Sequence, residues 1–343
     1  MKTELGKGEI AEEVLRSYFI EHGYFVVRSL PFAYNQIDIT DVDLWLYEKA
    51  SPFTRERTNV DIKNRSNPQA FERIIWAKGL QATLKLERAM VATTSTRKEA
   101  RDFGLANEVI VLEGNFLNNL IQKGISLNRI TEEIFLLDIE KESYGKGKDD
   151  WKGRYKASKG RLLSKLNFDG CNEYLREINY FLEQSLLRVD QNLTPLRLFY
   201  VNIAFLLICI DFMIKNHICL DQKTRMEFLA NGFNYGERGK ERTDSITNAA
   251  IKLASSVIAN PSIPRTLQME VNKQIKGRPV EILADFFSRD SSINSLFEIA
   301  KLFECFSYSQ VISPPSKLPV ELQSIIALIA DFFHIDRKRI LSI

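Results

Sequence analysis

The first 115 residues alternate between two spacings of hydrophobic positions, one typical of helices and one typical of strands. Residues 8–22 place apolar side chains three or four positions apart, from Ile10 to Phe19, which predicts an amphipathic helix. Residues 37–47 and 58–65 instead alternate apolar and polar side chains, as half-buried strands do. The same reasoning applied throughout predicts the order helix, strand, strand, strand, helix, strand, helix, strand at residues 8–22, 24–30, 37–47, 58–65, 69–87, 88–94, 97–105 and 108–114. This order is typical of an α/β domain.

Beyond about residue 125 the strand pattern gives way to long helical patterns that continue to the C-terminus. Eight basic residues lie between Lys146 and Lys165, with Trp151 and Tyr155 among them. Such a segment is either a solvated linker or a contact for nucleic acid. We therefore expect an α/β domain over residues 1–125, a basic linker over residues 126–165 and an all-helical domain over residues 166–343.

Composition narrows the class of protein only a little. The 47 basic and 44 acidic residues give a net charge of +3, which allows nucleic-acid binding without indicating it. The four cysteines are far apart and form no CxxC pair, and the N-terminus lacks a signal-peptide core, so we expect reduced thiols and a cytoplasmic protein. The longest apolar run, residues 198–214, is interrupted by Asn202 and Asp211, which favours a buried helix over a membrane span.

Two of the predicted strands turn acidic side chains toward the same side. Asp43 lies opposite the apolar face of its strand, and Asp61 and Lys63 do the same on the next strand. Two adjacent carboxylates repel each other unless a cation lies between them. The two aspartates, the backbone carbonyl of Ile62 and several waters suit Mg²⁺ or Mn²⁺, and Lys63 would stand beside a bound water and a phosphate. The pattern indicates a phosphodiester hydrolysis site.

Three short motifs on these elements, "GEIAEEV", "VDLW" and "DIK", resemble those of the PD-(D/E)XK nuclease superfamily, the restriction-endonuclease-like fold. The resemblance covers about residues 6–115 and implies a core of helix, three-stranded meander, helix and strand. It implies that Asp43 and Asp61 bind metal, that Lys63 is catalytic and that Glu12 completes the metal shell. Val42 stands where the family has proline. Taken alone, a DxK pattern on a strand is more often a solvated edge, and the order of the elements is what favours the nuclease interpretation.

Neighbouring acids compete with some of these assignments. On a helical wheel Glu12 borders the apolar stripe, whereas Glu13 points almost opposite its centre, so we expect Glu12 to face the site and Glu13 to face water. Asp38 and Asp41 are rivals of Asp43, but Asp38 falls on the opposite strand face and Asp41 lies further from the apolar half of the strand.

The resulting prediction is a Mg²⁺-dependent nuclease, acting on DNA in defence or repair, with nucleic acid as its main partner. A homodimer is compatible with it, and because the chain has no Walker-type phosphate loop, energy from ATP would require an ATPase or helicase partner. The alternative is a nucleic-acid-binding or assembly protein that keeps the fold without cutting. The residues predicted to contact nucleic acid are Arg65, Lys78, Gln81, Lys152, Arg154, Lys156 and Lys159.

Overall fold

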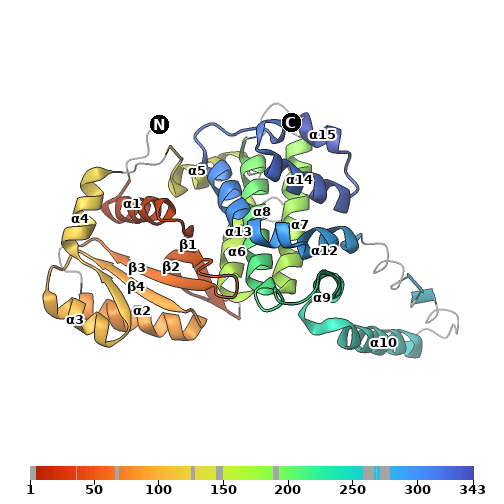
Figure 1. Ribbon diagram of the computed structural model, residues 1–343, viewed down its shortest axis with the longest axis horizontal. Coiled ribbons are helices and arrows are strands. Elements are labelled where there is room, and N and C mark those ends of the chain that lie inside the picture. The colour runs from red at the N-terminus through yellow and green to blue at the C-terminus, as the bar shows by residue number, and fades with distance from the viewer. Residues whose placement is uncertain are drawn as a thin grey trace. The chain divides into compact units, whose positions relative to one another are not determined.

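The computed structural model in Figure 1 describes residues 5–35, 37–65, 69–124, 128–143, 150–187, 193–257, 266–267, 269–270 and 279–343. The chain divides into two compact units. The first consists of Met1–Ser164 with Glu304–Ile312, and the second of Lys165–Phe303 with Ser313–Ile343.

The first unit is built on a five-stranded mixed sheet. Its elements are α1 (Lys7–Glu21), β1 (Phe25–Tyr34), β2 (Ile37–Glu48), β3 (Glu56–Lys63), α2 (Ala70–Leu84), β4 (Arg88–Thr93), α3 (Lys98–Ala106) and β5 (Val109–Leu112). The strands lie side by side in chain order; β1, β2 and β3 are antiparallel, while β3, β4 and β5 are parallel. The predicted order of elements is therefore confirmed, and the α/β class with it.

Helices cover both faces of this sheet (Figure 1), although the alternation of the strands predicted burial on one face. On one face, Leu44 and Val60 pack with side chains of α1 and of α4 (Gly114–Lys123). On the other face, Val91 packs with Ile74 of α2 and with partly buried side chains such as that of Phe103 in α3. Residues one position apart on a strand thus belong to different cores.

Residues 126–165 are not a linker, which corrects the sequence prediction. They contain α5 (Glu132–Glu142) and α6 (Trp151–Ser164), and both helices belong to the first unit. In α6, Trp151 and Tyr155 are fully buried. A β-carbon added at Gly160 would lie 2.9 Å from the carbonyl oxygen of Pro31 in β1, so α6 packs closely on that strand. The sequence analysis counted the lysines and arginines of this segment and missed the apolar side chains that recur among them at helical spacing, such as Trp151, Tyr155 and Leu162.

The described residues of the second unit form helices and short 3₁₀ turns, as predicted. They are α7 (Phe168–Leu187), α8 (Leu193–Ile214), α9 (Gln222–Tyr235), η1 (Gly236–Arg238), α10 (Gly239–Val257), α12 (Val280–Ser288), α13 (Asp290–Tyr308, its last residues in the first unit), η2 (Pro315–Lys317), α14 (Val320–Phe332) and α15 (Arg337–Leu341). The stretch Thr194–Ile214 of α8 is long and apolar enough to cross a membrane, but 89% of its most apolar window is buried inside the protein. It has the burial of a core helix.

Candidate active site

The strands β2 and β3 separate at one end, and the predicted acids lie where they part. Their paired register runs from Glu48 opposite Glu56 to Leu44 opposite Val60. Past that point a side chain links the two strands: Oδ2 of Asp43 accepts a hydrogen bond of 2.7 Å from the backbone N–H of Ile62. We call this opening, formed by Asp43 and by residues 61–63, the fork.

The backbone is irregular on the other side of Asp43 as well. The pairing of β1 with β2 joins Arg28 to Leu44 and Leu30 to Val42, which places Ser29 across from Asp43. Ser29 has a φ of 53°, in the left-handed region that non-glycine residues rarely adopt. Backbone strain of this kind is concentrated at functional sites. The strands are thus distorted around the first predicted metal ligand.

Asp61, the second predicted ligand, is held by an arginine that the sequence analysis missed. Its side chain is 8% exposed, and its two oxygens accept hydrogen bonds from Nε of Arg73, at 2.7 Å, and from Nη2 of the same residue. Arg73 lies near the start of α2, which runs antiparallel to β3 and begins beside the carboxyl end of that strand. That topology is the signal that could have identified it: a cation one turn into the helix that follows the DxK strand.

Lys63 and Arg73 provide the positive charge nearest to Asp43. Burial raises the pKa of Asp43, the Ile62 amide and the charges of Lys63 and Arg73 lower it, and the balance leaves the pKa above the usual aspartate value. At Asp43, burial therefore outweighs the favourable charges of the fork. A carboxylate in that condition favours either a proton or an added cation.

Glu12 is within electrostatic reach of Asp43, and Arg28 of β1 holds its side chain. Nε of Arg28 donates to Oε2 of Glu12 at 2.6 Å. Burial raises the pKa of Glu12, Arg28 lowers it, and the nearby charge of Asp43 raises it again, so the pKa lies above its usual value. The effect of Asp43 on the pKa of Glu12 is the link between this glutamate and the fork. Arg28 was not identified from the sequence.

Glu13 does not face water, which corrects the wheel prediction. Its side chain is fully buried and accepts hydrogen bonds from Nη1 of Arg28, at 2.8 Å, and from the backbone N–H of Glu132, at 3.0 Å. It belongs to a buried cluster of charged and phenolic side chains, here called the ion network: Glu13, Arg16, Arg28, Arg129, Glu132, Tyr155, Lys159, Glu304 and Tyr308. The far face of α1 is covered by polar partners from distant parts of the chain.

Glu132 is the most strongly stabilised acid of the ion network. Nζ of Lys159 donates to its Oε1 at 2.6 Å, and the hydroxyl of Tyr308 donates to its Oε2 at 2.6 Å. Burial alone would raise the pKa of Glu132, but the charges of Lys159 and Arg16 outweigh it and lower the pKa to about 2. These acids have their cations already in place.

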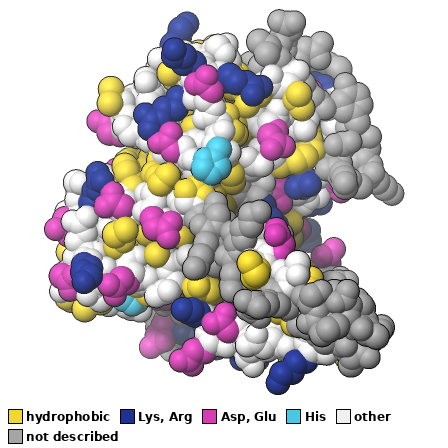
Figure 2. Space-filling model, turned by 90° about the vertical axis from the view of Figure 1, so that its right-hand side faces the viewer, with side chains coloured by type: hydrophobic (Ala, Val, Ile, Leu, Met, Phe, Trp, Pro, Cys, Tyr) yellow, Lys and Arg dark blue, Asp and Glu magenta, His cyan; other side chains and the backbone are white. Residues whose placement is uncertain are grey.

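Lys159 is consequently withdrawn from the predicted nucleic-acid contacts, because it is 2% exposed and bound to Glu132. Lys156 is exposed on the same helix, Arg154 is half-buried, and Lys152 forms an ion pair with Glu140 at the surface. Lys146 and Lys148 lie outside the described residues. On the face drawn in Figure 2, basic and acidic side chains are interspersed, in keeping with their near balance in the sequence.

The helix α2 turns Lys78 and Gln81 away from the fork, which corrects their assignment. Nζ of Lys78 donates to Glu108 at 2.9 Å, and Nε2 of Gln81 donates to the carbonyl oxygen of Glu87 at 2.9 Å. Both acceptors directly precede strands β5 and β4, at the end of the parallel strands opposite the fork. Arg65 is the second residue after β3 and is exposed, so it remains a candidate for phosphate contact.

The donor chemistry of the fork suits a divalent metal ion, but the observed arrangement is not a formed metal site. Asp43 and Asp61 are carboxylates, which Mg²⁺ and Mn²⁺ prefer. Arg73, however, holds both oxygens of Asp61. Among the residues that the structure describes, no group of three or more histidine, cysteine, aspartate or glutamate side chains is placed to hold a metal.

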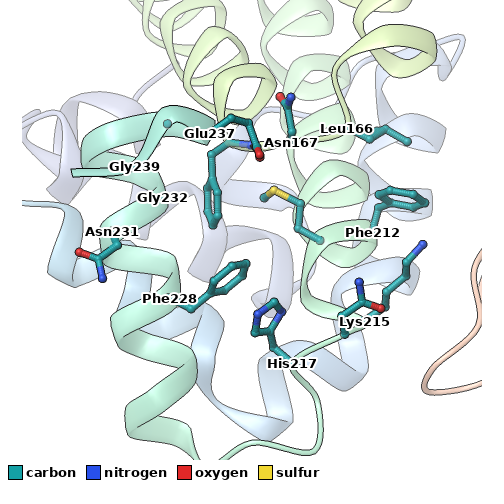
Figure 3. A pocket seen from close by; sticks show the side chains of 14 residues that line it. Leu166, Asn167, Phe212, Lys215, His217, Phe228, Asn231, Gly232, Glu237 and Gly239 are labelled. Atoms are coloured by element: carbon teal, nitrogen blue, oxygen red, sulfur yellow. Dashed lines mark hydrogen bonds between the residues drawn. The ribbon is translucent and has the colours of Figure 1, made fainter. Parts of the chain in front are cut away.

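A pocket with a volume of about 560 Å³ lies in the second unit (Figure 3). Aromatic rings form part of its wall: the rings of His217 and Phe228 stack with centroids 3.7 Å apart, and Phe168 packs edge-on against Phe228. Its acid, Glu237, accepts a hydrogen bond from the backbone N–H of Phe168 and so serves to hold α7. The residues that line this pocket include a single carboxylate, that of Glu237, so it does not offer the pair of acids that the sequence prediction requires.

Comparisons with protein-family models, with curated proteins and with solved structures find no match to this chain.

Proposed function

We propose that this protein is a metal-dependent nuclease that hydrolyses phosphodiester bonds, with DNA as its first candidate substrate, on a core of the PD-(D/E)XK type. The observation that carries the proposal is the fork itself: Asp43 and Asp61 flank the opening between two strands, and the charge of Lys63 reaches Asp43. The order and pairing of the elements around it agree with the core that the sequence resemblance implies.

The proposed roles follow from the positions of the side chains. Asp43 and Asp61, with the carbonyl oxygen of Ile62, would hold the ion, and Glu12 would contact its shell through water. A bound Mg²⁺ or Mn²⁺ would supply a Lewis acid and lower the pKa of a coordinated water. Lys63 orients the attacking water and offsets the charge that develops on the phosphate.

Basic side chains outside the fork supply the sequence-independent part of substrate binding in this proposal. Arg65 follows the catalytic strand, and Lys152, Arg154 and Lys156 lie along α6. Such residues bind phosphates and position the substrate without reading bases.

A non-catalytic nucleic-acid-binding protein is the second candidate, and a specific observation favours it. The guanidinium of Arg73 holds both oxygens of Asp61, as a structural ion pair would. A protein that had given up catalysis could keep the fold in this form.

Incubation of the protein with plasmid DNA, single-stranded DNA and RNA tests the proposal, with Mg²⁺, with Mn²⁺ and with EDTA. We expect metal-dependent cleavage by the wild type and none by Asp61→Asn. Asp41→Asn, which removes an exposed acid from the neighbouring strand β2, is the control and should cut normally. Absence of cleavage by the wild type with every metal and substrate would favour the binding protein, and full activity in Asp61→Asn would remove the fork from the mechanism.

A further inference from the structure

We propose that Arg73 is an exchangeable cation: it holds Asp61 while the fork contains no metal, and it releases Asp61 when a divalent ion binds. This inference rests on the proposed function, since it concerns how the same fork is loaded. Asp43 and Asp61 are carboxylates of the kind that binds divalent metal ions, yet Arg73 already holds Asp61. Exchange of Arg73 for a metal ion accounts for both observations.

The geometry of the pair is that of a strong but local contact. Nε and Nη2 of Arg73 meet the two oxygens of Asp61 in parallel, the arrangement that matches a guanidinium to a carboxylate. Asp61 comes from β3 and Arg73 from α2, and the charge of Asp43 also acts on Arg73. One arginine therefore serves both acids of the fork, in the place where a metal would act on both.

The surroundings of Arg73 permit it to leave. Its side chain is 23% exposed, against 1% for Arg16 and 2% for Lys159 in the ion network. It lies near the N-terminal end of α2, where the helix dipole disfavours a cation. Its guanidinium also lies 5.7 Å from the ring centroid of Trp76, a side chain that is itself exposed. Arg73 is thus partly exposed and lies beside an exposed side chain of α2.

Exchange has a thermodynamic consequence for metal binding. If Arg73 occupies Asp61 for most of the time, the apparent metal affinity falls by the fraction of molecules in which Asp61 is accessible. A substitution of Arg73 that weakens its contact with Asp61 should then tighten metal binding, although it changes a residue of the fork's surroundings. A residue needed to build the site would have the opposite effect. After release, the guanidinium stands beside the fork, where it can bind a phosphate oxygen.

Direct Mn²⁺ titration, followed by electron paramagnetic resonance and calorimetry, tests the exchange without any need for cleavage. We expect Arg73→Gln to bind Mn²⁺ about tenfold more tightly than the wild type. Arg73→Lys keeps the charge but loses the two-pronged contact, so it should also bind more tightly, by a smaller factor. A purely electrostatic effect of removing a positive charge would leave Arg73→Lys unchanged, and that result would overturn the proposal.

The matched control is Arg57→Gln. Arg57 makes the same kind of two-pronged contact with Glu87 at the other end of the sheet, and its loss should leave Mn²⁺ affinity unchanged. Circular dichroism melting confirms that each variant is folded, and Arg73→Lys serves if Arg73→Gln is not.

The outcomes separate this inference from the proposed function. Binding of Mn²⁺ that depends on Asp61 but is equal or weaker in both Arg73 variants would overturn the exchange and leave the nuclease proposal intact. Absence of Asp61-dependent Mn²⁺ binding in the wild type and in both Arg73 variants would overturn both.

Discussion

The first unit contains two clusters of acids and cations, the ion network and the fork. They differ in how far the cations offset the burial of the carboxylates. In the ion network, Glu132 and Glu304 are surrounded by cations, and the pKa of each lies below its usual value because Lys159, Arg129 and Arg16 outweigh the effect of burial. In the fork, burial raises the pKa of Asp43 above its usual value despite Lys63 and Arg73. At the two glutamates of the ion network the cations outweigh burial, whereas at Asp43 burial outweighs the cations.

The comparison shows why burial of charge alone does not identify a functional site. The ion network is the more deeply buried of the two clusters, yet all its members serve one another. The fork is shallower, and its acids have partners that can exchange. Arg28 belongs to both, because it donates to Glu12 through Nε and to Glu13 through Nη1. The ion network thus fixes the arginine that positions Glu12.

The largest expected effect is on catalysis by the fork. Asp43→Asn and Asp61→Asn should each lower metal-dependent cleavage by about 10³-fold or more, equivalent to about 4 kcal/mol in the barrier. Nucleic-acid binding should persist, because phosphates are bound elsewhere. Cleavage rates under saturating metal, measured beside binding by fluorescence anisotropy, check this. Loss of binding together with cleavage would indicate that the acids support the fold and not the chemistry.

Breaking the ion network should instead cost stability. Lys159→Met leaves Glu132 buried without its nearest cation, and removal of one partner from a buried pair typically costs about 3–5 kcal/mol. Lys156→Met, three residues away on the exposed side of α6, should change stability by less than about 0.5 kcal/mol. Urea unfolding of both variants measures the difference. Equal stability of the two would mean that Glu132 finds another partner.

Removal of Lys63 should separate catalysis from metal binding. Lys63→Ala should lower the cleavage rate by about 10²-fold, because the lysine acts on the water and the phosphate. Its Mn²⁺ affinity should not fall, since it contributes no ligand. A titration of rate against metal concentration tests both statements. A requirement for more metal in this variant would show that Lys63 supports the aspartates instead.

The two clusters should respond to pH with opposite signs. A raised pKa in the folded state means that the ionised form of Asp43 costs stability, a cost absent below about pH 4 and growing as pH rises through the folded pKa. Without metal, Asp43→Asn should therefore be more stable than the wild type at pH 7, with no advantage in acid.

The reverse holds for Glu132, whose pKa of about 2 gives stability that is present above about pH 4 and is lost as pH falls toward 2. Glu132→Gln should be much less stable than the wild type at pH 7, and the gap should narrow in acid. Melting temperatures measured from pH 3 to pH 8 for both variants provide the comparison. Parallel curves would contradict the distinction between the two clusters.

The smallest expected effect concerns the surface of α6. Replacing Lys152 and Lys156 by alanine should reduce the slope of log affinity against log salt by about 1 for each phosphate that the variant no longer binds. Lys223→Ala, an exposed lysine of the second unit, is the control. An unchanged slope would leave α6 with a structural role only.

The sequence by itself determined the features that depend on local periodicity. Alternation along two strands was enough to place Asp43, Asp61 and Lys63 on the same side, and the order of elements in the first 115 residues followed from spacing and turn residues. The register between β2 and β3 then brings Asp43 to the Ile62 amide. A period of two or of 3.6 residues shows on which face of a strand or helix a side chain lies, because that face is set by the positions of its neighbours in the sequence.

Only the tertiary structure decided which charged side chains are partners. A helical wheel predicts that Glu13 faces water because it uses the sequence of α1 alone. In the folded protein, Arg28 and Glu132 cover that side of the helix. Lys159 looked like a surface cation for the same reason. Arg73 holds Asp61 because the chain between them folds back, and Arg16 meets Glu304 from 288 positions away. Pairing of charges depends on distance in space, which no local pattern records, so the sequence predicted the acids of the fork and the fold supplied the cations that hold them.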